Sequence, residues 1–166
     1  MSEADDEPLV SALLAVSRTM VALTARSLTA LDVDVTLPQY RALVVLATGP
    51  RRSAELAREL GVAASTLTRM CDRLCQKGMV QRFQRDGNRR TVWLGLTAAG
   101  RATVGAVMLA RQDELRRIVR DSGLVASGRT LTVLHRFVQA GGELPDDEWW
   151  RCWQHSAEDA ARLNVG

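Results

Sequence analysis

Residues 53–97 read SAELARELGVAASTLTRMCDRLCQKGMVQRFQRDGNRRTVWLGLT, and this stretch decides the fold. The spacing of its apolar residues predicts a short helix, a tight turn, a second helix and a two-stranded hairpin. Ser53 is expected to cap the first helix, residues 54–60, and Gly61 is expected to end it. The predicted order is therefore helix, turn, helix and hairpin.

The second helix, residues 64–77, has one apolar face and one basic face. The apolar residues recur at i, i+3, i+4 and i+7, as in a buried stripe: Leu67, Met70, Cys71 and Leu74. The outward face carries hydroxyls and arginines: Ser65, Thr66, Thr68, Arg69 and Arg73. Arg69 and Arg73 repel each other at i, i+4 by roughly 0.2 to 0.5 kcal/mol, so a nearby anion would be favourable. Asp72 is expected to relieve part of this repulsion at Arg69. A solvated basic face is the alternative interpretation of this helix taken alone.

A basic hairpin follows the helix. Gly78 is expected to end the helix, because glycine adopts a positive φ without strain. Two runs typical of β-strands come next, residues 79–84 and 91–96. The turn between them contains an Asp-Gly step, which is common in tight hairpins. It projects three arginines: Arg85, Arg89 and Arg90. Such a unit can place its second helix in the major groove of DNA and its hairpin on the backbone or in the minor groove.

Positive charge is concentrated on this unit. Residues 50–90 carry nine arginines and Lys77 against four acidic residues, an excess of +6. The formal net charge of the whole chain is +3, which leaves −3 for the remainder. A local positive field of this kind is typical of nucleic-acid-binding proteins.

These motifs resemble those of the multiple-antibiotic-resistance regulator (MarR) family. The resemblance is carried by the runs LGVAASTLTRMCDRL (60–74) and NRRTVWLGLT (88–97), and by Gly78 between them. The family's wing signature resembles Asp-x-Arg, five residues, then Leu-Thr. Three residues match it: Arg90, Leu96 and Thr97. Asn88 stands where the family usually has aspartate, and Asp86 lies two residues away.

The resemblance implies a mainly α-helical winged helix-turn-helix fold with a small β-hairpin wing. It also implies an intertwined homodimer of helical dimerisation elements. The chain is expected to form a single domain, residues 1–166. Within it, residues 37–101 would be the DNA-binding lobe, and residues 8–31 and 98–163 the helical dimerisation region.

The flanking segments predict further helices. Residues 8–31 fit a long amphipathic helix, which is either a core helix or, given the resemblance, a dimer-forming one. Thr36 and Gln39 are spaced as a capping box that opens a helix to about residue 48. Thr97 is expected to cap a helix over 98–121, and a further helix begins at 124 or 127 and ends at 140.

The C-terminal tail begins a last helix at Pro145 and carries three tryptophans. Trp149, Trp150 and Trp153 lie within five residues of one another. They are expected to seal the dimer or to pack over the last helices. A surface for a partner protein, or the lining of a ligand site, is the alternative.

Other chemistry has weaker support. Cys71 and Cys75 lie one helical turn apart and could sense oxidants, but their apolar setting favours a packing role.

Only His135 and His155 could add imidazole ligands, and neither is spaced as a metal ligand with a cysteine, so no metal and no cofactor are expected. No catalytic motif is recognisable, and we expect no enzyme. No apolar run appears long enough to span a bilayer, and the acidic N-terminus is unlike a signal peptide, so a cytoplasmic protein without membrane partner is expected.

The sequence therefore predicts a dimeric DNA-binding transcriptional regulator. The second helix would meet base edges and phosphates through Ser65, Thr66, Thr68, Arg69 and Arg73, and the wing would use Arg85, Arg89 and Arg90. A two-fold dimer would bind double-stranded DNA at an approximate inverted repeat. The resemblance further implies a repressor released by a small aromatic or phenolic effector, although no motif identifies its ligand-binding residues. A winged-helix protein-interaction module and a thiol-based sensor using Cys71 and Cys75 are the alternatives.

Overall fold

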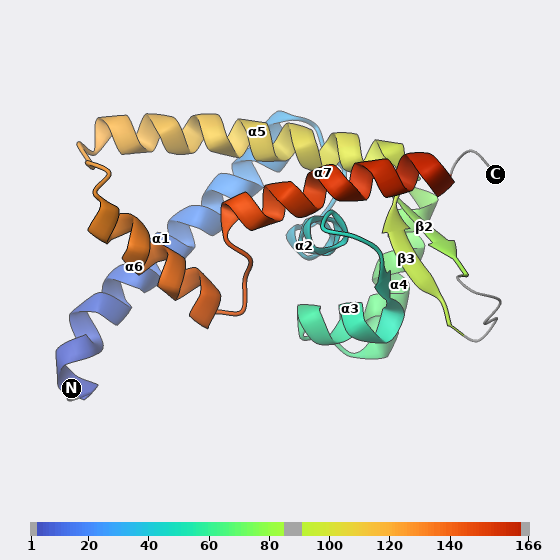
Figure 1. The fold of residues 1–166 in the computed structure, drawn as a ribbon, viewed down its shortest axis with the longest axis horizontal. Helices are drawn as coiled ribbons and strands as arrows, with labels where there is room; N and C mark the ends of the chain where they lie inside the picture. The colour runs from blue at the N-terminus through green and yellow to red at the C-terminus, as the bar shows by residue number, and fades with distance from the viewer. Residues whose placement is uncertain (1–2, 85–90, 164–166) are drawn as a thin grey trace.

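The computed structural model describes residues 3–84 and 91–163. Seven helices and three short strands make up this part of the chain (Figure 1). In chain order they are α1 (Glu3–Ala30), α2 (Leu37–Leu46), β1 (Arg51–Arg52), α3 (Ser53–Leu60), α4 (Ala64–Gln76), β2 (Val80–Phe83), β3 (Trp93–Leu96), α5 (Ala98–Asp121), α6 (Gly128–Ala140) and α7 (Asp146–Leu163). The predicted mainly helical fold with a small hairpin is confirmed.

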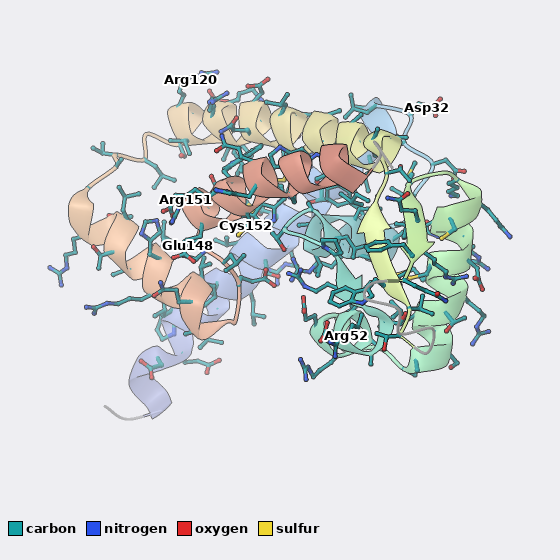
Figure 2. All side chains as sticks on the ribbon, turned by 45° about the vertical axis from the view of Figure 1, so that its right-hand side comes forward. Asp32, Arg52, Arg120, Glu148, Arg151 and Cys152 are labelled. Atoms are coloured by element: carbon teal, nitrogen blue, oxygen red, sulfur yellow. The ribbon has the colours of Figure 1, made fainter. Side chains whose placement is uncertain are left out.

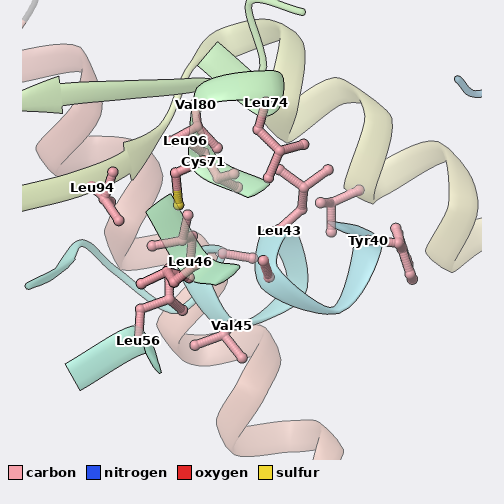
Figure 3. Packing of buried hydrophobic residues seen from close by; sticks show 14 of the residues in the cluster. Tyr40, Leu43, Val45, Leu46, Leu56, Cys71, Leu74, Val80, Leu94 and Leu96 are labelled. Carbon is pink, nitrogen blue, oxygen red and sulfur yellow. The ribbon is translucent and has the colours of Figure 1, made fainter. Parts of the chain in front are cut away.

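The hydrophobic core joins the predicted helix-turn-helix unit to α2, α5 and the sheet. Its completely buried side chains include Leu43 of α2, Leu56 of α3, Leu74 of α4 and Val104 of α5. Leu94 of β3 packs into the same cluster (Figure 3). The predicted buried face of α4 is confirmed, except that Met70 lies at its half-buried edge.

The sheet has three antiparallel strands in the order β1-β3-β2. The predicted hairpin is confirmed, with Val80 opposite Leu96 and Phe83 opposite Trp93. Strand β1 was not predicted, because two consecutive arginines carry no strand signal of their own. Its register, Arg51 opposite Leu94, comes from pairing with β3.

Most helix ends lie close to where the sequence predicts them. The Thr36 and Gln39 capping box is present, and Gly61 and Gly78 both adopt the left-handed conformation that ends a helix. Helix α2 stops at Leu46, two residues before the predicted end. The prediction for Ser53 was wrong: it is the first helical residue of α3, and Arg52 is the cap. The Glu55 carboxylate accepts a hydrogen bond from the Arg52 backbone N–H at 3.1 Å, which fixes the cap of the helix one residue before Ser53.

The hairpin is held tightly against the start of α5. Thr97 caps α5, and its hydroxyl also donates a 2.6 Å hydrogen bond to the carbonyl of Gly78. Its backbone N–H donates to the carbonyl of Met79 at 3.1 Å. Gly100, one turn into α5, is buried at this contact. A Cβ at Gly100 would lie 2.1 Å from the Met79 carbonyl oxygen, so only glycine fits.

Helix α7 folds back along the rest of the chain, beside α5 and across the end of α2 (Figure 1). Trp149 is 9% exposed and belongs to the hydrophobic core. Its ring stacks with that of Trp153, with centroids 5.4 Å apart. Arg101 of α5 donates to the Trp153 carbonyl at 2.6 Å, and the Ser156 hydroxyl donates to the Ala47 carbonyl at 2.8 Å. The tryptophans therefore pack over helices of this chain, as one of the two interpretations predicted.

Helices α1 and α6 leave apolar surface uncovered. Helix α6 buries none of its residues, and its exposed apolar side chains include Leu131, Leu134 and Phe137. Helix α1 projects from the rest of the chain at its N-terminal end (Figure 1), where Leu9 and Leu14 are more than half exposed. The expectation that no apolar run could span a bilayer was wrong: residues Asp6–Ala30 are long and apolar enough by length and composition alone. The core helix of a soluble protein and a signal sequence share this property.

Candidate nucleic-acid interface

Helix α4 presents the predicted hydroxyl and arginine residues to solvent. All five are exposed: Ser65, Thr66, Thr68, Arg69 and Arg73. The Thr68 hydroxyl donates to the Ala64 carbonyl at 2.9 Å, so it is partly engaged by its own helix. The start of α4 has no side-chain cap, which leaves its first backbone N–H groups available to a phosphate oxygen. This face of α4 is suited to an anionic partner.

Asp72 does not serve Arg69 as the sequence predicted. Its Oδ1 accepts a 2.7 Å hydrogen bond from Arg82 Nη2, on strand β2. This hydrogen bond raises the pKa of the Arg82 guanidinium. Asp72 pairs with Arg82 and not with Arg69 because the hairpin brings Arg82 close to the carboxylate. This is a tertiary contact that helical spacing alone does not reveal. Within residues 3–84 and 91–163, Arg69 and Arg73 therefore have no ion-pair partner.

Arg85, Arg89 and Arg90 lie outside the described residues, as do Asp86 and Asn88. The two strands that lead to them are described. Phe83 and Trp93 form the last strand pair before this turn, and β2 runs beside α4. The role of the wing arginines therefore remains a prediction. The hairpin that carries them has its base next to α4.

Two basic residues that the sequence did not single out lie on strand β1, at the opposite edge of the sheet from β2. Arg51 and Arg52 form β1 and precede α3, and Arg52 lies where α3 begins beside the sheet (Figure 2). The Arg52 guanidinium lies 5.2 Å from the centre of the Trp93 ring, a cation-π contact. Arg51 forms an ion pair with Glu59 at 3.2 Å, and Arg52 lies 3.9 Å from the Glu55 carboxylate. The local excess of positive charge in the sequence indicates a basic surface. It does not show which arginines form ion pairs within the chain.

The thiols of α4 are in a setting that opposes ionisation. Burial raises the pKa of Cys71 to about 11, and burial also raises the pKa of Cys75. All three cysteines of the chain, including Cys152, are free. The thiolate is the reactive form, so the raised pKa values of Cys71 and Cys75 disfavour the sensor alternative.

We therefore expect slow alkylation of Cys71 by iodoacetamide at pH 7 to 8, with a rate that rises only toward pH 11. The unfolded chain ionises this thiol near pH 9.0, so the contribution of the buried thiol to stability is intact below pH 9.0 and falls between there and about 11. Mass spectrometry of the native protein, with the urea-unfolded protein as control, measures the rate. Equal rates in the two states at pH 7.5 would contradict the prediction.

A second candidate site lies between α1, α2 and α5. A cavity of about 300 Å³ is bordered there by apolar side chains, among them Met20, Val21 and Val44. Its polar lining comes from Tyr40 and Arg111, with Thr24 and Arg41. Tyr40 Oη and Arg111 Nε are both buried, and neither has a hydrogen-bond partner in the described part of the chain. Burial raises the pKa of Tyr40, and the positive charge of Arg111 partly offsets that rise.

No group of three or more potential metal ligands occurs among the described residues.

Two features of the molecule could bind a partner or ligand. One is the basic face of α4 on a winged helix-turn-helix frame, and the other is an apolar cavity with two buried polar atoms that lack a hydrogen-bond partner in the described part of the chain. The helix-turn-helix unit with its small antiparallel sheet places the molecule in the winged helix-turn-helix class, whose members commonly bind DNA.

Comparisons with known proteins agree with this class. A family model described as "MarR family" matches residues 35–92. Rv1404 from Mycobacterium tuberculosis is 36% identical, over 88% of this chain and 99% of that one, with a TM-score of 0.76. A MarR family protein from Bacillus stearothermophilus is 26% identical over 84% of this chain and 94% of that one, with a TM-score of 0.68. A mutant MarR from E. coli, complexed with operator DNA, is 25% identical over 87% of this chain and all of that one (100%), with a TM-score of 0.61. No curated protein matches the sequence.

The chain belongs to the MarR family of transcriptional regulators. The family consists of DNA-binding transcriptional regulators and not of enzymes.

Proposed function

We propose that this protein is a dimeric repressor that binds operator DNA through α4 and the wing. The observation that carries the proposal is the exposed face of α4, where Arg69 and Arg73 have no ion-pair partner in the described part of the chain. Ser65, Thr66 and Thr68 share this face, so hydroxyl and guanidinium donors can meet base edges and phosphates together. Arg85, Arg89 and Arg90 would extend the contact to the adjacent backbone or minor groove.

The uncovered apolar surface of α1 and α6 supports the homodimer. Contiguous exposed apolar side chains mark interaction surfaces, and Phe137 of α6 is 54% exposed in the single chain. Residues 8–31 and 98–163 would form the dimerisation region around a lobe of residues 37–101. A two-fold dimer places its two α4 helices about one DNA turn apart, so the operator would be an approximate inverted repeat. On this proposal α1 packs on a second copy, and the protein acts in the cytoplasm.

The proposal is tested by fluorescence-anisotropy titration on the duplex upstream of the protein's own gene and on a shuffled duplex. A dimer contacting about six to ten phosphates gives a log-log salt slope near −5 to −9. Binding to the operator should be about a thousandfold or more tighter than to the control. Sedimentation of the free protein should give twice the monomer mass of 18.2 kDa. A monomer, or a protein without affinity for either duplex, would contradict the proposal.

We further propose that a small aromatic or phenolic acid releases the DNA by binding the cavity at Tyr40 and Arg111. An aromatic ring suits the apolar walls, and its acid group would satisfy the Arg111 guanidinium and the Tyr40 hydroxyl. The cavity lies between α1 and α2, so occupancy can favour a spacing of the two lobes that misfits the operator.

A panel of aromatic acids added to the protein-DNA complex tests this step. The expected result is a fall in anisotropy with the acids and none with the matched uncharged amides, because the amides lose the ion pair with Arg111. Replacing Arg111 with glutamine should remove the response and leave binding to DNA in place. Release of DNA by acids and amides alike would mean that Arg111 is not the recognition group.

A further inference from the structure

We propose that Arg82 is a positioning residue for DNA recognition, which holds Asp72 so that this carboxylate neither faces the DNA phosphates nor captures Arg69. The inference rests on the proposed DNA-binding function of α4. It assigns a role to a strand residue that does not itself lie on α4.

The bridge joins the two elements that would read the DNA. Asp72 lies on α4, next to Arg73 and three residues after Arg69. Arg82 lies on β2, opposite Leu94 of β3, and β2 leads directly into the wing turn. The 2.7 Å contact between Arg82 Nη2 and Asp72 Oδ1 therefore fixes the base of the wing to the middle of the helix.

A contribution to folding stability alone does not explain the ion pair between Arg82 and Asp72. The two side chains are 42% and 44% exposed, and ion pairs this exposed contribute little to folding stability. Asp72 is the only acidic residue of α4, and it lies among the groups that would face phosphates.

Loss of Arg82 would leave a free carboxylate in this position. On a helix, residues at i and i+3 are neighbours, so Asp72 could then pair with Arg69 and draw its guanidinium away from DNA. The unpaired carboxylate would also repel the phosphate backbone. Arg82 prevents both effects by occupying Asp72 from the strand side.

A double-mutant cycle on the operator duplex tests the inference with four proteins: wild type, Arg82→Ala, Asp72→Asn, and the double variant. Arg82→Ala should weaken binding about tenfold, because the carboxylate is released beside the DNA. Asp72→Asn should change binding by less than about threefold, because no charge is left to release. The double variant should bind like Asp72→Asn, with the salt slope of the wild type.

Two results would overturn the inference. If Arg82→Ala weakens binding equally in both backgrounds, and lowers the salt slope by about one in the double variant, Arg82 contacts a phosphate itself. If Arg82→Ala has no effect in the wild-type background, Asp72 does not matter for DNA. Arg82→Lys, which keeps the charge, should recover most of the affinity lost in Arg82→Ala.

Folding and function are separated by two further measurements. Thermal unfolding of the four proteins should show similar midpoints, because the pair is exposed. The wild type on operator and shuffled duplexes tests the DNA-binding function itself. A wild type that binds neither duplex overturns the proposed function and this inference together, whereas a binding wild type without coupling in the cycle overturns this inference alone.

Discussion

Replacing Arg69 with alanine is expected to weaken operator binding by about 1 to 3 kcal/mol and to relax specificity at the base pair it contacts. The reason is that Arg69 is exposed on α4, and no other residue of the described chain forms an ion pair with it. Its guanidinium is thus free to make a bidentate contact with guanine or phosphate. Anisotropy titrations on the operator and on single-base variants of it measure both effects.

Arg120→Ala is the matched control, since Arg120 is an exposed arginine at the far end of α5 (Figure 2). It removes the same charge from the chain at a distance from α4, so operator affinity should fall little. Equal losses in the two variants would mean that net charge, and not the α4 surface, determines binding.

Replacing Gly100 with alanine is expected to lower the free energy of unfolding by about 2 to 3 kcal/mol. The added Cβ would lie 2.1 Å from the Met79 carbonyl oxygen and 3.0 Å from its carbonyl carbon. These are backbone atoms, so the hairpin or the start of α5 must shift as a unit. Chemical unfolding in urea, followed by far-ultraviolet circular dichroism, measures the change.

Gly105→Ala, on the same helix, provides the comparison. There the nearest atom to an added Cβ is a Trp153 ring carbon at 3.7 Å, an ordinary contact. Because alanine is a better helix former than glycine, this variant should be stabilised by about 0.5 to 1 kcal/mol. Destabilisation of both variants to the same extent would show that the contact with Met79 is not the cause.

The features that the sequence predicted correctly depend on local chemistry. The Thr36 capping box, the Thr97 cap and the glycines at 61 and 78 each act within one turn of chain, so neighbouring residues are enough to identify them. The buried and exposed faces of α4 follow from helical periodicity in the same way.

The features that the sequence did not reveal depend on contacts between distant segments. Strand β1 exists because β3 pairs with it, and Asp72 changes partner because the hairpin brings Arg82 to it. The cavity requires Tyr40 and Arg111 to meet from helices far apart in the chain. No local pattern carries this information, so residues 53–97 predict the helix-turn-helix unit and the hairpin but not the tertiary contacts that support them.

The packing of α7 has a practical consequence. The chain contains four tryptophans, and three of them contact one another on α7 while the fourth, Trp93, lies on the strand that leads from the wing. Native ultraviolet emission of the tryptophans therefore originates from two separate places in the chain. A Trp93→Phe variant would leave emission that reports on the C-terminal helix alone, and its difference from the wild type isolates the signal at the wing. The protein thus carries its own optical probes for following the tail and the wing separately, without an attached dye.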